Sequence, residues 1–128
     1  MKNTAFYLGI SLLFTHELDA MSNHEWRIIP GLSALPEAAG AATFLIAHVP
    51  LFALVIAFIA SLNPKIRDRA RNIACGFLLV HAVAHYLFSS HSAYEFSSVL
   101  SAVLIYGAAF CGAAYFVALR FENDAKIF

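Results

Sequence analysis

The chain has 128 residues, of which 61% are hydrophobic and only 12% are charged. A soluble domain has about 45–50% apolar and about 25% charged residues, so this composition excludes an ordinary soluble protein and predicts an integral membrane protein. The length predicts one domain over residues 1–128. A net charge of zero gives no support for a nucleic-acid partner, which leaves membrane lipids as the expected partners.

Four apolar runs predict an all-α polytopic membrane protein with four transmembrane helices in a bundle. The helices are expected at about residues 4–20, 37–62, 65–89 and 93–120. A helix needs about 20 apolar residues to cross the hydrocarbon core, and the second and fourth runs meet that length comfortably. The first apolar run, at about 4–20, and the third, at about 73–89, are shorter, and each carries polar residues toward one end.

The boundaries between the runs contain helix-start signals. Asn63 followed by Pro64 predicts a cap and a first helical residue for the third helix. Ser92 and Glu95 form the S-x-x-E pattern of a capping box, which predicts the start of the fourth helix.

Basic residues predict the direction in which the helices cross the membrane. The segment between the second and third helices holds four of the eight Lys and Arg residues, namely Lys65, Arg67, Arg69 and Arg71. Basic loops favour the cytoplasmic side. With four crossings, Lys2, Arg120 and Lys126 fall on that side and Arg27 falls opposite. We therefore expect both termini inside and two outward loops.

Histidines and carboxylates gather in the outer half of this topology. His16, Glu17 and Asp19 end the first helix, while His81 and His85 are an i, i+4 pair near the outer end of the third. His48 lies about 12 Å from the outer end of the second helix, counted at 1.5 Å per residue. Ionisable groups at membrane depth cost several kcal/mol unless they are satisfied, which makes them candidates for a functional site.

Imidazole and carboxylate side chains are ligands for zinc, iron and manganese. The predicted metal ligands are His16, Asp19, His48, His81 and His85. Zinc is the expected divalent metal and iron the alternative. Glu17 points about 100° away from His16 and about 160° away from Asp19, so it is not expected to join both as a ligand. It could support a ligand, carry a proton or face another helix, and we predict it as the catalytic residue. A metal-bound water beside Glu17 could hydrolyse an ester or amide of a lipid near the outer face.

Other readings of these residues stay open. His48 with His81 or His85 could be axial ligands of a b-type haem in a four-helix bundle. The polar groups could also form a proton or metal path in a non-enzymatic ion carrier or accessory subunit. Without any metal, His81 and His85 would hydrogen-bond to carboxylates of the first helix, and His48 would be a satisfied core residue. Trp26 and Tyr94, in the outer loops, are expected to be membrane-interface anchors.

The fourth helix carries small residues at four-residue spacing. Ala108 with Gly112, and Ala109 with Ala113, give two faces that allow a close helix approach. This pattern predicts either a scaffold helix or a face for a homo-oligomer.

The motifs resemble a group of small uncharacterised bacterial integral membrane proteins that is named for an HxxEE signature. The matching parts are the segment 16–20, Glu25 with Trp26, and His81 with His85. The acid pair of the signature falls at Asp19 and Ala20, so only one acid is present. The resemblance implies four or more helices in the bacterial cytoplasmic (inner) membrane and a suspected metal site, with no established reaction.

Overall fold

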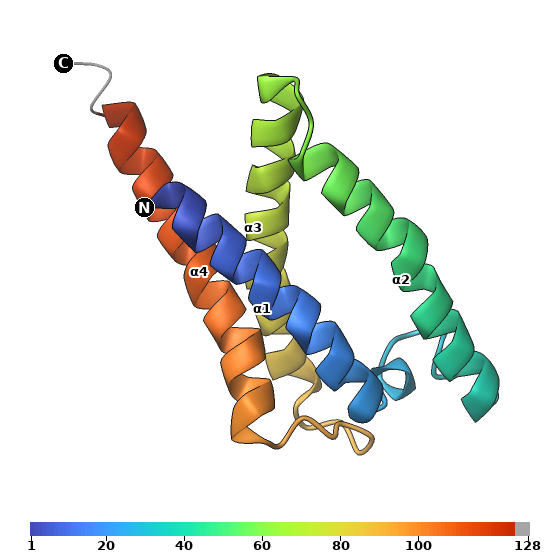
Figure 1. Cartoon of the computed structure of the whole chain (residues 1–128). Helices are drawn as coiled ribbons and strands as arrows, with labels where there is room; N and C mark the ends of the chain where they lie inside the picture. Colours follow the sequence, from blue (N-terminus) through green and yellow to red (C-terminus); the bar gives the residue numbers. More distant parts are fainter. Residues whose placement is uncertain (125–128) are drawn as a thin grey trace.

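A computed structural model describes residues 1–124 and shows an all-α chain, as predicted (Figure 1). The four long helices are α1 (Lys2–Ser22), α2 (Glu37–Ile59), α3 (Pro64–Phe88) and α4 (Val99–Asp124). A short 3₁₀ turn, η1 (Glu25–Arg27), follows α1. Lys126 lies outside the described residues.

Three of these helices, α2, α3 and α4, are long and apolar enough to cross a membrane. Among the described residues α1 does not join them, because its second half carries Thr15, His16, Glu17 and Asp19. The crossing of α1 and the orientation of the termini stay predictions.

The helix starts agree with one sequence signal and correct the other. Asn63 caps α3 as predicted, since its side chain accepts hydrogen bonds from the backbone N–H groups of Lys65 and Ile66 at 3.0 and 3.4 Å. The capping box at Ser92 is wrong, because α4 begins at Val99. Ser98 performs the capping role, and its Oγ accepts a hydrogen bond from the N–H of Ser101 at 2.9 Å.

Helices α1, α3 and α4 pack closely through small residues. A Cβ atom added at Gly112 would lie 2.7 Å from the Cys75 carbonyl oxygen of α3, and one at Gly9 would lie 2.8 Å from the Leu78 side chain. Ala108 is buried as well. The Ala108–Gly112 face of α4 therefore serves contacts within the chain. The homo-oligomer remains a prediction, with the partly buried Ala109 and exposed Ala113 as its remaining face.

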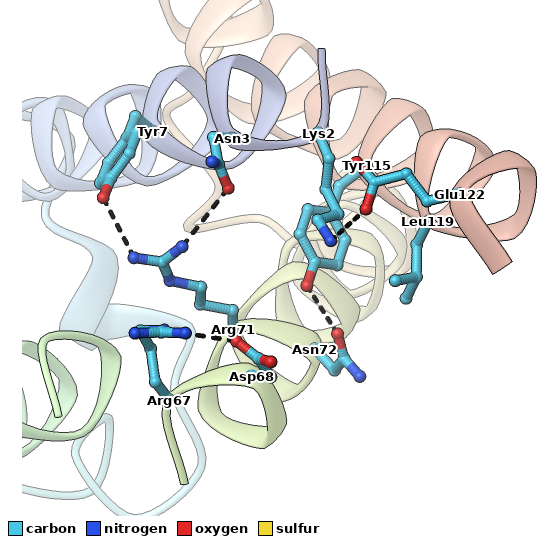
Figure 2. Close-up of a pocket in the computed structure, with 10 residues that line it drawn as sticks. All are labelled: Lys2, Asn3, Tyr7, Arg67, Asp68, Arg71, Asn72, Tyr115, Leu119 and Glu122. Carbon is cyan, nitrogen blue, oxygen red and sulfur yellow. Dashed lines mark hydrogen bonds and ion pairs between the residues drawn. The ribbon is translucent and has the colours of Figure 1, made fainter. Parts of the chain in front are cut away.

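The first residues of α1 and the basic segment at the start of α3 lie around one pocket (Figure 2). Arg71 donates hydrogen bonds to Tyr7 Oη at 3.0 Å and to Asn3 Oδ1 at 3.4 Å, which ties α3 to α1. Lys2 pairs with Glu122 across the start of α1 and the end of α4. Lys2 and Arg71 thus lie at the same end of the helices as predicted, whereas the side of the membrane on which they lie stays a prediction.

Candidate metal centre

Two helices supply the three histidines of the site. His16 projects from the last turns of α1, and its side chain is 0% exposed. His81 and His85 lie one turn apart on α3, so both rings face the same direction. The rings of His16 and His85 are in edge contact, with centroids 4.9 Å apart. Three of the four histidines predicted as ligands are therefore brought together.

A loop supplies the carboxylate. After α1, His24 adopts a left-handed conformation with φ of 50°, which turns the chain back toward the helix end. The next residue, Glu25, opens η1, and its side chain is only 12% exposed. Its two oxygens lie 3.5 Å from His16 Nε2 and 3.5 Å from His85 Nε2. Glu25 therefore bridges the histidines of α1 and α3.

The spacing of these donor atoms fits one small cation. His16, Glu25, His81 and His85 each offer a ligand atom, and all of these atoms lie within 4.8 Å of one another. His81 Nε2 and His85 Nε2 are 3.2 Å apart. Ligands at 2.0–2.1 Å from a tetrahedral zinc ion are about 3.3 Å from each other. Three of the six separations, at 3.2, 3.5 and 3.5 Å, are close to that edge length, and the others are no longer than 4.8 Å.

His16 is a buried polar group without a hydrogen bond. Neither of its ring nitrogens has a hydrogen-bond partner among the described residues. Most buried polar side-chain atoms in native proteins have a partner, so an orphaned imidazole needs an explanation. A bound cation at the position that Nε2 faces would supply one.

Tyr94 supports the site from the loop between α3 and α4. Its hydroxyl lies 3.2 Å from His85 Nδ1. A histidine that binds metal through Nε2 carries its proton on Nδ1 and donates it to a neighbour, which orients the ring. Burial raises the pKa of Tyr94 to about 12, so its hydroxyl stays neutral. The expected interface anchor is instead a partner of the histidine cluster.

The charge of Glu25 suits a cation ligand. Burial on its own would raise the pKa of this carboxyl, but the facing His16 and His85 imidazoles lower it to about 2. The carboxylate is thus ionised at neutral pH and needs to lose no proton on binding a metal.

Glu17 and His48 form a separate pair beside the cluster. Glu17 Oε2 lies 2.9 Å from His48 Nε2, and His48 Nδ1 donates to the Phe44 carbonyl at 2.7 Å. Glu17 thus faces α2, which agrees with its position about 100° around the helix from His16. Both residues line a groove that Glu25 and His81 also line.

The four-residue group differs from the predicted ligand set by the absence of Asp19 and His48 and by the addition of Glu25. Asp19 and His48 do not belong to it. Asp19 lies about 4.5 Å further along the axis of α1 than His16, at 1.5 Å per residue, toward the helix end. His48 is held by Glu17 and the Phe44 carbonyl. Glu25 takes the place of the fourth donor, so the arrangement gives no support to Asp19 or His48 as ligands.

The loop that carries Glu25 is fixed by packing and ion pairs. Trp26 is buried against Gly40, where an added Cβ would lie 3.0 Å from Trp26 Cδ1, so it is not the predicted interface anchor. Arg27 pairs with Glu37 at 3.0 Å and with Glu95 at 2.6 Å. Glu95 therefore joins the two outer loops. The prediction that it caps α4 is wrong. The position of Glu25 is held by these contacts.

Taken together, fold and site define an all-helical protein with three helices that can span a membrane and a buried His/Glu cluster able to hold a metal ion. The chain belongs to a family of unknown function (DUF6713), whose family model matches residues 2–122. Searches of curated proteins and of solved structures found no match. The family match does not name the HxxEE-signature group, and that resemblance stays a prediction.

Proposed function

We propose that this protein binds one divalent transition metal in the bacterial cytoplasmic membrane, near its outer face. The ligands are His16, Glu25, His81 and His85. The observation that carries the proposal is the spacing of their donor atoms, all within 4.8 Å of one another. Three imidazoles and one carboxylate are a borderline-soft donor set, which favours zinc, with iron as the alternative.

The same geometry favours a single ion over a haem. A haem with two histidine ligands needs them on opposite faces of a flat macrocycle. Here the rings of His81 and His85 are in edge contact, with centroids 4.5 Å apart on one helix. His48, the other predicted axial ligand, is paired with Glu17. The rings of His81 and His85 are in contact, so a macrocycle does not fit between them.

Elemental analysis tests the proposal on protein purified in mild detergent without chelators. We expect about one zinc or iron per chain and no Soret band in the optical spectrum. Protein without a stoichiometric transition metal, which also fails to bind added zinc, would contradict the proposal. A Soret band would establish the haem alternative in its place.

Metal-assisted hydrolysis is a second candidate, favoured by the position of the Glu17–His48 pair. The pair lines the same groove as two of the proposed ligands, Glu25 and His81. Zinc can expand its shell from four ligands to five, so a water that joined the four side chains on the metal would have a lowered pKa. Glu17 would take the proton of that water as the oxygen bonds to the carbonyl carbon of an ester. The bond to the alcohol then breaks, and the alcohol leaves with the proton that Glu17 returns.

The variant Glu17→Gln separates hydrolysis from metal binding. Because Glu17 is not a proposed ligand, we expect unchanged metal content and a fall of about 100-fold or more in the hydrolysis of a long-chain chromogenic ester in micelles. Wild-type protein without hydrolytic activity, or a fully active variant, would reject this second candidate. Metal or proton flux in vesicles, abolished by Glu17→Gln, would instead establish the ion carrier.

A further inference from the structure

A long groove runs between α1, α2 and α3. Its volume is about 980 Å³. Figure 1 shows α2 standing apart from the other helices along most of its length. The walls are predominantly apolar and include Ile10, Phe14, Phe52, Val55, Ile59 and Ala74.

The two ends of the groove differ in charge. At one end lie the Glu17–His48 pair and the cluster residues Glu25 and His81. At the other end, by the α2–α3 connection, lie Lys65 and Arg69. The distance from residue 65 to residue 81 along α3 is about 24 Å, at 1.5 Å per residue. The cationic end is therefore well separated from the metal cluster.

The two cations at this end lack an ion-pair partner in the part of the chain that the structure describes. Neither Lys65 nor Arg69 forms an ion pair with any residue in the described range 1–124. The neighbouring basic residues are engaged elsewhere: Arg67 bonds to Asp68, and Arg71 bonds to Tyr7 and Asn3 around a different pocket (Figure 2). The positive charges of Lys65 and Arg69 at the mouth of the groove are therefore not neutralised by the described residues.

We propose that the groove binds an anionic membrane phospholipid, with its phosphate at Lys65 and Arg69 and one acyl chain along the apolar walls. Water in such a groove would wet apolar side chains, and an empty groove would lose their dispersion contacts. A lipid chain avoids both costs. One leaflet of the hydrocarbon core is about 15 Å deep, half of about 30 Å, so a groove of about 24 Å accommodates the chain and leaves the cluster uncovered.

Lipid titration followed by native mass spectrometry of the full chain tests the charge component. The lipids are phosphatidylglycerol and phosphatidylcholine with identical dioleoyl chains. Each Lys or Arg near a membrane surface contributes about 1 kcal/mol toward anionic lipid, so the double variant Lys65→Gln with Arg69→Gln should bind phosphatidylglycerol about 30-fold more weakly. The matched control Arg67→Gln, which changes the charge on the other face, should remain near wild type.

Two further measurements test the acyl-chain component. Val55→Trp fills the middle of the groove and should weaken binding of both lipids, whereas Val103→Trp, on an exposed face of α4, should not. Inorganic phosphate should not displace the lipid. Equal binding of the two lipids by wild type, or unchanged binding in the double variant or in Val55→Trp, would overturn the proposal. Metal content serves as the folding control, so failure here is distinguishable from failure of the metal site.

Discussion

Replacing His16 with alanine should reduce metal affinity by about 100-fold or more and leave the purified protein essentially without metal. Apparent binding energies of structural zinc sites are about 10–16 kcal/mol, or about 3 kcal/mol for each of four ligands. His16 is buried, and neither of its ring nitrogens has a described hydrogen-bond partner, so Nε2, which faces Glu25, is available to a cation. His81→Ala and His85→Ala should have the same effect, because each removes one donor from the same group. Metal content and competition with a chelator of known affinity measure the loss.

His91→Ala is the matched control for these variants. His91 is exposed in the loop after α3, and its Nδ1 accepts a hydrogen bond from the Ala93 N–H at 3.1 Å. It lies outside the four-residue group. Its replacement should therefore leave the metal in place. Equal metal content in His16→Ala and His91→Ala would show that the buried histidines do not share an ion.

Glu25→Gln should weaken metal binding by a similar factor of about 100, since the amide removes the one negative charge of the ligand set. The carboxylate faces two imidazoles at 3.5 Å, which outweigh its burial and lower its pKa to about 2, so it is negatively charged at neutral pH. The amide has nearly the same shape, so the loop contacts made by Trp26 and Arg27 should persist. Isothermal titration with zinc measures the difference.

Asp19→Asn is the contrasting variant, because it changes the acid that sequence spacing predicted as a ligand. Asp19 lies outside the group, so zinc affinity should stay within about threefold of wild type. A large loss in Asp19→Asn together with a small loss in Glu25→Gln would return the carboxylate role to α1 and refute the observed arrangement.

The helices could be predicted from sequence because their signals are local. Apolar runs long enough for a membrane and the Asn63–Pro64 start signal depend on neighbouring residues alone. The start of α4 could not be read from local signals, because several serines precede Val99 and each is a possible cap. Ser92 has a glutamate three residues later, but that glutamate, Glu95, pairs with Arg27 from a distant loop. A tertiary ion pair therefore overrode a local capping pattern.

The histidines of the site could be predicted from local spacing, whereas its carboxylate depends on tertiary contacts. The four-residue spacing places His81 and His85 on one face of α3. The predicted topology places His16, at the end of α1, at the same depth in the membrane. Glu25 depends on the left-handed turn at His24 and on Trp26 packing against Gly40, neither of which has a periodic signal. The only clue in the sequence was the Glu25–Trp26 pair, which carries part of the resemblance to the HxxEE-signature group. The inward turn of Tyr94 likewise depends on a loop conformation.

X-ray absorption at the metal edge of zinc-loaded protein tests the shared site most directly, because it reports the atoms around the ion. The arrangement predicts a first shell of four nitrogen and oxygen atoms at about 2.0–2.1 Å, with the outer-shell scattering of three imidazole rings. A shell without imidazole scattering, or with a single ring, would contradict the convergence of His16, His81 and His85 on one ion.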